Sequence, residues 1–193
     1  KHASTVGSYD LDIISENFNN NDVLDRTLNN RFEVIFLIGQ DNLKLKKKNE
    51  FIIYIGSHGD RGAEIADVIL PGSSYTEQDG HYTNLEGVLQ KAYKATYPPG
   101  EAKEDWEIIN NLSELLKRKK IYNNKDELVS KMIHFINNNK NKKTETNSGN
   151  FCDEKIFTEY TDYYYSNVIS RSSKTMSECR NIRNNIKKTG TEG

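Results

Sequence analysis

The chain has 193 residues, with 27 lysine and arginine residues against 28 aspartate and glutamate residues, and a formal net charge of −1. That length suits one domain or a large piece of a bigger one, and the near-neutral charge argues against a chain-wide surface for nucleic acid or acidic membranes. Two cysteines exclude a four-thiolate iron–sulfur cluster and a secreted disulfide framework, and no apolar run approaches the ~20 residues of a membrane helix.

Asparagine and lysine dominate the polar residues. The chain has 23 Asn and 20 Lys but only 7 Arg. We interpret this bias as the mark of an A+T-rich genome rather than of disorder or of a functional asparagine tract, which would be longer. The first residue is Lys1 rather than Met, so we expect the chain to be processed or to be a piece of a longer protein. No apolar segment at its start indicates a signal peptide.

The first two stretches of the chain differ in character. Residues 1–30 are polar, and their scattered apolar positions are compatible with one or two short helices. Residues 31–100 form an α/β core piece. Two nearly continuous apolar runs, Phe32–Ile38 and Phe51–Ile55, each end at a glycine and are typical of strands buried on both faces of a parallel sheet.

A third short strand is predicted at Val68–Leu70, where Pro71 and Gly72 end the apolar run. A helix of about two turns fits between the second and third strands, within residues 61–67. This order of strand, glycine turn, helix and strand is expected of a parallel α/β layer. The glycine-punctuated residues 73–94 suit an irregular excursion with a hairpin.

Pro98, Pro99 and Gly100 mark a boundary, because prolines stiffen the chain and disfavour helix before them. A helix is predicted over residues 101–120, with Trp106 and several aliphatic residues at helical spacing. Acidic residues occupy its first turns and four basic residues, 117–120, its last, so both ends complement the helix dipole.

A second helix is predicted over residues 125–136, so that 101–136 forms a helical segment. Residues 137–150 are of low complexity and are predicted to be a solvated loop. Residues 151–193 form a C-terminal extension with a tyrosine cluster and a basic end.

Residues 56–62, Gly-Ser-His-Gly-Asp-Arg-Gly, follow a predicted strand and precede a predicted helix. Phosphate-binding loops occur at this position because free backbone N–H groups and the helix dipole favour an anion. The spacing is GxxGxxG, not GxGxxG, and no GK[ST] follows. We therefore favour a tight turn that needs glycine for steric reasons, with His58 capping it or pairing with Asp60, over an anion site or a general base.

Other residues that could take part in catalysis or metal binding have simpler structural interpretations. The four histidines are His2, His58, His81 and His134, and they form no zinc-binding motif. No GxSxG motif is present either. Three neighbouring carboxylates could form an acid–base pair, but a satisfied turn or a structural salt bridge is the favoured interpretation; they are Glu77, Asp79 and Glu86.

The tyrosines at 160 and 163–165 could stack nucleic-acid bases, but base-stacking surfaces come with a basic groove. Packing in a core or a subunit interface is the favoured interpretation. Cys152 and Cys179 are single thiols without a CxxC partner, and we expect inert structural roles.

Residues 51–90 closely resemble a segment of the large iron–sulfur subunit (75 kDa-type, G) of respiratory complex I, NADH:ubiquinone oxidoreductase. That family shows a QGHHGD-like turn, then ADVILPG, then TExxxxYxNxEGR. The chain has Ala66–Gly72 and Thr76–Gly87 in the same order. The resemblance continues through 98–106 and 112–114, resumes at 162–164 and 170–176, and extends upstream to residues 3–11.

This resemblance implies a C-terminal portion of that subunit, with an α/β fold. The fold is part of a Rossmann-like parallel-sheet layer of the molybdopterin oxidoreductase type, followed by a helical C-terminal extension. In the family this region resembles molybdopterin enzymes but lacks their cofactor, and the clusters lie in the N-terminal part of the subunit. We therefore expect no catalytic, cofactor-binding or metal residue here, and no cofactor in this chain. One departure is Val88 in place of the family's Arg, which removes the bidentate contacts of a guanidinium. A second is Leu85 in place of a common Thr.

We expect the chain to be non-catalytic alone but to belong to a proton-translocating NADH:ubiquinone oxidoreductase. A partial α/β domain would expose sheet edges and core faces, so it should need a partner to stay folded. Two alternatives remain: a fragment of a molybdopterin enzyme that binds its cofactor, since ADVILP is shared with those enzymes, and a free-standing nucleotide-binding module built on residues 56–62.

The resemblance implies other peripheral-arm subunits as partners, especially the cluster-bearing N-terminal part of the same subunit. Neither nucleic acid nor a direct membrane span is expected. The expected location is the mitochondrial inner membrane on its matrix side, with the cytoplasmic side of a bacterial membrane as the alternative.

Overall fold

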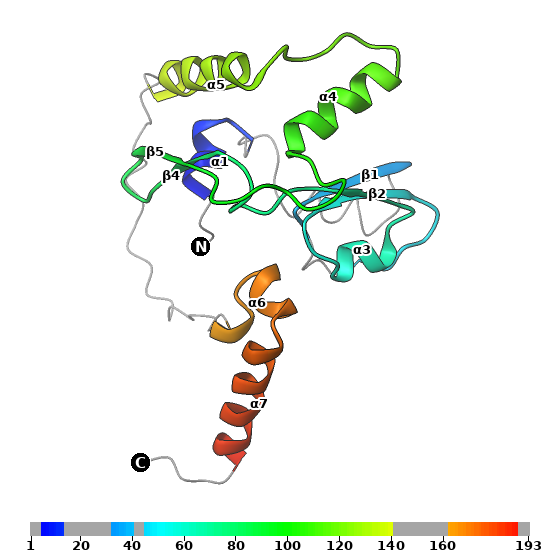
Figure 1. The fold of residues 1–193 in the computed structure, drawn as a ribbon, viewed down its shortest axis with the longest axis vertical. Helices are drawn as coiled ribbons and strands as arrows, with labels where there is room; N and C mark the ends of the chain where they lie inside the picture. Colours follow the sequence, from blue (N-terminus) through cyan, green and yellow to red (C-terminus); the bar gives the residue numbers. More distant parts are fainter. Residues whose placement is uncertain (1–4, 14–31, 41–44, 141–161, 189–193) are drawn as a thin grey trace, which may run out of the picture. The chain divides into compact units, whose positions relative to one another are not determined.

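The computed structural model describes residues 5–13, 32–40, 45–140 and 162–188 (Figure 1). The chain divides into two compact units, Lys1–Glu145 and Thr146–Gly193. The division falls inside the stretch 137–150 that the sequence predicts as a loop.

A parallel three-stranded sheet is the centre of the first unit. Its strands are β1 (Val34–Ile38), β2 (Phe51–Gly56) and β3 (Val68–Pro71), in the order β1-β2-β3. Val34 aligns with Phe51, and Ile53 with Val68. The predicted parallel α/β layer is thus confirmed, and all three strands lie within one or two residues of their predicted positions.

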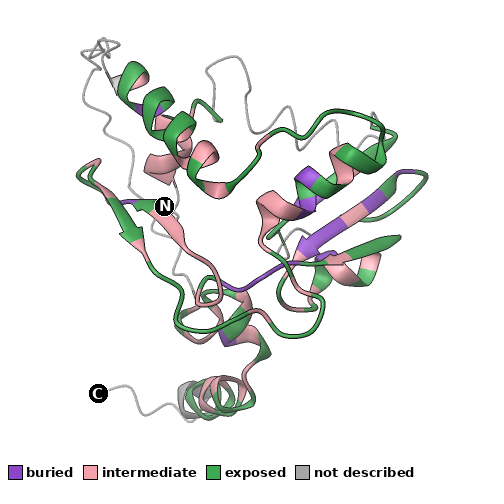
Figure 2. Ribbon diagram, turned by 45° about the horizontal axis from the view of Figure 1, so that its top comes forward, coloured by how far each residue is buried: buried purple, intermediate pink, exposed green. Residues whose placement is uncertain are grey.

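One face of this sheet packs against α3 (Arg61–Ile65) and the residues around it. The buried centre of this face is the cluster of Leu37, Ile52 and Tyr54, each at most 4% exposed. The partly buried hydrophobic residues against this cluster are Ile35, Leu45, Ala63, Ile65 and Ala66. Figure 2 shows the buried residues concentrated on β2, which is the middle strand.

The predicted helix over 101–120 is α4 (Asp105–Leu115), which begins four residues later and ends five residues earlier than predicted. Lys117 adopts a positive φ of 57°, and its N–H bonds the carbonyl of Glu114. The basic residues 117–120 therefore follow the helix instead of forming its last turn, which contains no basic residue. The acidic half of the prediction is correct, because Asp105 and Glu107 lie in the first turn.

The predicted second helix is α5 (Lys125–Lys140), and it extends four residues into the stretch predicted to be a loop. The Asn-rich composition misled the prediction at this point, because Asn is only a weak helix former. Ile136, near the end of α5, is only 3% exposed, so burial of the apolar face accompanies the continued helix. Residues 141–150 of the predicted loop lie outside the described part.

The predicted hairpin in 73–94 is formed by β4 (Gly80–Thr83) and β5 (Leu89–Ala92), which pair antiparallel. The Asn84 side chain organises the connecting turn, because its Oδ1 accepts the N–H groups of Glu86 (3.0 Å) and Val88 (2.9 Å). Gly87 has a φ of +77°, a conformation that favours glycine.

In the predicted polar segment 1–30, the structure describes one helix, α1 (Thr5–Asp10), which contacts β4 and α5. The rest of the predicted helical content, from residue 14 to 31, lies outside the described residues. No described helix combines the length and the hydropathy that a membrane crossing requires.

The described part of the second unit is helical. It consists of η1 (Tyr163–Tyr165), α6 (Val168–Ser172) and α7 (Lys174–Lys188). Asn167 starts α6 with a reciprocal capping box, in which its side chain accepts the N–H of Ser170 and Ser170 Oγ accepts the N–H of Asn167. The predicted C-terminal extension is therefore helical where it is described.

Candidate functional site

The glycine-containing turn at residues 56–62 lies where the sequence places it, between β2 and α3. Asp60 starts α3 and its Oδ1 accepts the N–H of Arg61 at 2.8 Å. Tyr54 on β2 donates its hydroxyl to the carbonyl of His58 at 2.8 Å. The turn is therefore tied to the buried strand that precedes it, and α3 has only five residues.

Two of the three glycines in this turn make room for Tyr54. A Cβ atom on Gly56 would lie 2.3 Å from Tyr54 Oη, and one on Gly62 would lie 2.8 Å from the Tyr54 ring. A Cβ atom on Gly62 would also lie 2.7 Å from the carbonyl oxygen of Gln40. At Gly56 and Gly62, the side on which a Cβ would lie is occupied by the chain's own tyrosine. Of the three, only Gly59 faces open space.

The carboxyl edge of the sheet is closed between β2 and β3. Ligands of open α/β sheets bind in the crevice beyond this edge. Here the N–H of Gly72 bonds the carbonyl of Gly56 at 3.0 Å, and a Cβ on Gly72 would lie 2.9 Å from Asp105 Oδ1. The carboxylate of Asp105, the first residue of α4, thus lies beside Gly72 at this edge. Its burial, with the Glu104 carboxylate as a second cause, raises the pKa of Asp105.

Ser73, which follows β3, is the one feature at this edge that the sequence did not reveal. It is 7% exposed, and within the described part of the chain its Oγ meets no hydrogen-bond partner. Its backbone N–H is satisfied by the carbonyl of Lys103 at 2.8 Å. A single orphaned hydroxyl beside a closed crevice does not make a cradle for a cofactor.

A network of polar contacts joins the starts of α4 and α5 to the hairpin. Glu104 accepts a hydrogen bond from Trp106 Nε1 at 2.9 Å and forms an ion pair with Lys125. Lys125 also donates to the carbonyl of Asp79 at 2.8 Å. Since these groups saturate one another, the network fixes the arrangement of three elements and presents no reactive group.

The three candidate carboxylates are each part of local structure. Glu77 Oε2 accepts the N–H of Ser74 at 2.8 Å, and Asp79 Oδ1 accepts the N–H of Lys94 at 2.8 Å. That backbone hydrogen bond is the main reason that the pKa of Asp79 is lowered, and nearby lysines add to it. Glu86 lies in the hairpin turn, where its N–H bonds Asn84. These separate local contacts favour the structural interpretation over an acid–base pair.

The histidines are dispersed. His58 Nδ1 lies 2.9 Å from Ser57 Oγ in the glycine turn, and His134 Nε2 lies 3.1 Å from Asn138 Nδ2 on α5. Burial, with Lys91 as a second cause, lowers the pKa of His81 on β4. His2 lies outside the described residues. Within the described ranges, no group of three or more His, Cys, Asp or Glu side chains could hold a metal ion.

The tyrosines of the second unit pack against its own basic residues. Tyr163 and Tyr164 make an edge-to-face contact, with ring centroids 5.5 Å apart. The Arg180 guanidinium lies 4.6 Å from the centroid of Tyr165 and pairs with Asp162. Tyr164 and Tyr165 are thus engaged within this unit, whereas Tyr163 is 72% exposed. Tyr160 lies outside the described residues.

Of the two cysteines, only Cys179 lies in the described part of the chain. Cys179 is half-buried on α7 as a free thiol, and Cys152 lies outside the described residues. Leu85 and Val88, the two residues of the hairpin turn that differ from the family pattern, face solvent, because they are 92% and 50% exposed. No described residue therefore occupies a recognisable catalytic arrangement.

Comparison with known proteins gives two family matches. Residues 1–115 match the family model described as molybdopterin oxidoreductase. Residues 133–179 match the model for the C-terminal region of the G subunit of NADH-ubiquinone oxidoreductase.

Similar individual proteins are much longer than this chain. It is 38% identical to the NADH-ubiquinone oxidoreductase 75 kDa subunit of Reclinomonas americana, over 93% of this chain and 28% of the relative. It is 38% identical to the G subunit of the NADH-quinone oxidoreductase of Rickettsia bellii, over 98% and 28%. It is 39% identical to the mitochondrial NADH-ubiquinone oxidoreductase 78 kDa subunit of Candida albicans, over 75% and 23%. The chain thus spans no more than 28% of the length of these relatives.

Proposed function

The chain belongs to the molybdopterin oxidoreductase family, and on that premise we propose that it is a structural part of the large iron–sulfur subunit of a complex I. The predicted resemblance to the C-terminal portion of that subunit is confirmed by the matches to the 75 kDa, 78 kDa and G subunits. In this proposal the chain supports electron transfer from NADH to ubiquinone by packing against the cluster-bearing part of the peripheral arm. The chain alone catalyses no step, and the complex to which it belongs translocates protons.

The observation that carries this proposal is the near-complete coverage of the chain by one kind of relative. Between 93% and 98% of the chain aligns with the 75 kDa and G subunits at 38% identity. The geometry supports a structural role, because Gly56 and Gly62 pack against Tyr54 and Gly72 packs beside Asp105.

The family name implies a molybdopterin cofactor, and the described residues do not fit one. An elongated pterin with phosphate groups needs an open cradle of backbone N–H groups. A Cβ atom added at Gly56, Gly62 or Gly72 would instead lie 2.3–2.9 Å from side chains or backbone of this chain. We propose that this chain holds no cofactor and that the iron–sulfur clusters belong to the N-terminal part of the subunit or to a partner chain.

We place the protein on the matrix side of the mitochondrial inner membrane. The relatives include mitochondrial and bacterial proteins, so the cytoplasmic side of a bacterial membrane is the alternative. The partners in either location would be the other subunits of the peripheral arm.

Native electrophoresis of membranes from the producing cells tests this function. The chain, followed by an antibody, should co-migrate with the band that stains for NADH dehydrogenase activity. A chain that never enters that band refutes the proposal. Stoichiometric molybdenum in the purified assembly would favour the cofactor-binding alternative, and saturable binding of a labelled nucleotide to residues 56–62 would favour the nucleotide module.

A further inference from the structure

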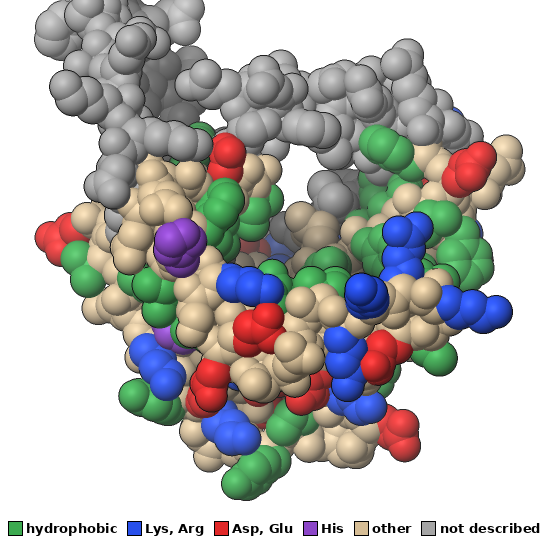
Figure 3. Space-filling view, turned by 90° about the horizontal axis from the view of Figure 1, so that it is seen from above, with side chains coloured by type: hydrophobic (Ala, Val, Ile, Leu, Met, Phe, Trp, Pro, Cys, Tyr) green, Lys and Arg blue, Asp and Glu red, His purple; other side chains and the backbone are tan. Residues whose placement is uncertain are grey.

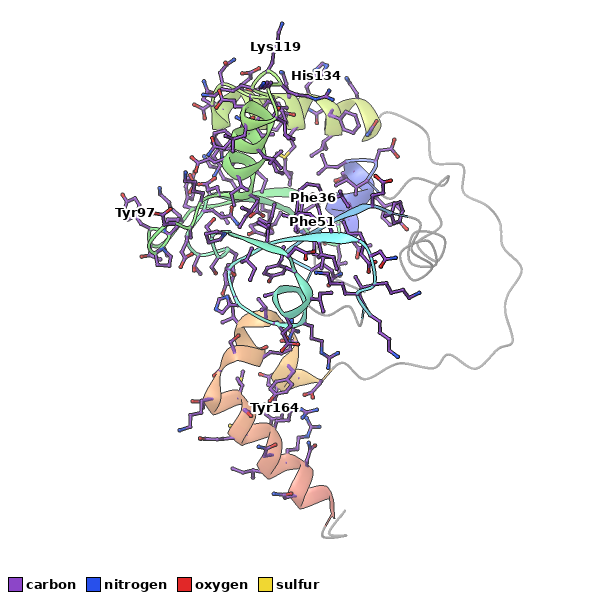
Figure 4. All side chains as sticks on the ribbon, turned by 90° about the vertical axis from the view of Figure 1, so that its right-hand side faces the viewer. Phe36, Phe51, Tyr97, Lys119, His134 and Tyr164 are labelled. Carbon is purple, nitrogen blue, oxygen red and sulfur yellow. The ribbon has the colours of Figure 1, made fainter. Side chains whose placement is uncertain are left out.

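Among the residues that the structure describes, one face of the parallel sheet is left partly uncovered. The side chains that alternate with the buried cluster of Leu37, Ile52 and Tyr54 point to the face away from α3. Five large hydrophobic residues on this open face are between 38% and 49% exposed; they are Val34, Phe36, Ile38, Phe51 and Val68. Figure 4 labels Phe36 and Phe51, which lie on the adjacent strands β1 and β2.

The helix α4 covers only part of this face. Leu70 of β3 and Ile108 of α4 line a common apolar depression, and Ile108 is 8% exposed. Ile55, at the same end of β2, is 1% exposed. The cover stops there, because Val34 and Phe51, in register at the start of β1 and β2, remain almost half exposed. Hydrophobic side chains gather on the right of Figure 3, the side on which Figure 1 shows this sheet.

Parallel sheets in proteins are covered on both faces because the helices that connect their strands pack there, and the strands therefore read as continuous apolar runs. A contiguous apolar surface of this kind marks an interaction site in a soluble protein. The usual cover is an α-helix, which lies along the strands and presents an apolar stripe. β1 is also an edge strand, so nothing in the described sheet continues past it.

The relatives indicate which polypeptide supplies the cover. The 75 kDa and G subunits are matched by this chain over only 28% of their length, so most of a subunit of that size lies outside these residues. The molybdopterin oxidoreductase match continues through the sheet and α4 to residue 115. On the proposed function, the open face therefore lies in a part of the subunit that other segments of its polypeptide would adjoin.

We propose that the open face, at Val34, Phe36, Ile38, Phe51 and Val68, is the docking surface for an apolar helix of the polypeptide that completes the subunit. This inference rests on the proposed function and goes further by assigning the contact to one side of one sheet. A second copy of this chain and an unrelated peripheral-arm subunit are the competing occupants, and the experiment separates them.

Site-specific photo-crosslinking in the assembled complex tests the proposal. A photoreactive phenylalanine analogue replaces Phe36 on the open face, and in a matched protein it replaces Ile69. Ile69 is 54% exposed on the edge strand β3, in register with Tyr54 and therefore on the α3 side of the sheet. Mass spectrometry of the excised complex identifies the crosslinked peptide.

The expected product joins position 36 to a peptide of the large subunit that lies outside residues 1–193. Position 36 should give at least about tenfold more of this product than position 69. Crosslinking of position 36 only to another copy of this chain, only to a different protein, or no more strongly than position 69 overturns the proposal. If the chain co-migrates with NADH dehydrogenase activity and position 36 fails in one of these ways, the docking surface is refuted while the proposed function stands. If the chain does not co-migrate, the proposed function itself fails.

Polar substitution provides a second measurement. The double variant Val34→Thr, Phe36→Thr keeps β-branched residues in the strand but removes the apolar contact. We expect at least about fivefold less of this variant in the complex, while the Ile69→Thr variant assembles like the natural sequence. Equal assembly of the two variants contradicts the proposal.

Discussion

Substitution of Gly62 by alanine tests whether the glycine turn is a packing device. The new Cβ would lie 2.7 Å from the carbonyl oxygen of Gln40 and 2.8 Å from two ring carbons of Tyr54, against 3.4 Å or more for an ordinary contact. The first neighbour is a backbone atom and the second belongs to a side chain that is 2% exposed, so moving either of them costs free energy. Overpacking of this kind costs about 1–3 kcal/mol, which lowers the ratio of folded to unfolded protein by about 5- to 150-fold.

The matched control is Gly59→Ala in the same turn. No atom lies within 4 Å of its added Cβ, and its φ lies outside the left-handed region. Gly59→Ala should therefore be neutral or stabilise the fold by up to about 1 kcal/mol, because alanine has less freedom in the unfolded chain. Resistance of the chain to proteolysis in increasing urea, followed in the purified assembly, measures both variants.

A phosphate-binding loop predicts a different result, since backbone must approach the ligand along the whole turn. Gly59→Ala would then abolish anion binding while leaving stability nearly unchanged. The packing interpretation is refuted if Gly62→Ala unfolds at the same urea concentration as Gly59→Ala. The double variant Tyr54→Leu, Gly56→Ala adds a test of coupling, because the alanine at 56 should cost much less once the tyrosine ring is absent.

Three further predictions concern polar contacts. Lys125→Met should lower the free energy of unfolding by about 1.5–3 kcal/mol, since Glu104 loses its cation. It should also change the fluorescence of Trp106, the only tryptophan. Unchanged emission and unchanged stability would contradict the network. Asn110→Ala should cost about 1–3 kcal/mol in urea unfolding, because the buried Asn110 side chain bonds the backbone of Ile121 and Tyr122, whereas Asn111→Ala should cost little. The backbone N–H of Asn123 and the ammonium group of Lys131 lower the pKa of Glu127 from 4.5 to about 2. Its contribution to stability should therefore be complete above pH 4.5 and lost as the pH falls toward about 2, so Glu127→Gln should flatten that part of the stability curve, and a variant curve parallel to the natural one would contradict it.

The strands were predictable because burial on both faces leaves a strong mark on the sequence. Each predicted run, at 32–38, 51–55 and 68–70, is a nearly unbroken series of β-branched, aliphatic or aromatic residues that stops at glycine or proline. The same argument gave the parallel layer. It could not reveal that part of one face is open, because an apolar run looks the same whether its cover lies in this chain or in another polypeptide.

The helix ends were harder to predict because the charge pattern was misread. Residues 117–120 resemble a basic last turn, yet the chain leaves the helix at Leu116 and Lys117 turns into a left-handed conformation. The side chain of Ser113 donates to the carbonyl of Lys119 at 2.9 Å, and Asn110 binds the residues that follow. These polar contacts, rather than the dipole, organise the chain after the helix.

Asn110 also shows why composition conceals particular residues. It is one of 23 asparagines. No sequence pattern distinguishes most of them from ordinary surface residues. Its carboxamide is nevertheless buried, with Oδ1 accepting two backbone N–H groups and Nδ2 donating to a carbonyl at 2.6 Å. The only signal available was its position directly after two aliphatic residues in a helical pattern. That signal does not distinguish Asn110 from Asn111 beside it.

The glycine turn was ambiguous for a physical reason. A backbone that approaches a phosphate and a backbone that approaches an aromatic ring both exclude a Cβ, so each requires glycine at the same place between strand and helix. Only the direction of approach distinguishes them, and here Gly56 and Gly62 face Tyr54 while Gly59 faces open space. Because Tyr54 also anchors the turn through the carbonyl of His58, removing the ring would leave a void in the cluster with Leu37 and Ile52 rather than open a ligand site. The residues of this turn therefore stabilise the α3 side of the sheet, and the open face on the other side is where this fold has apolar surface left to offer another polypeptide.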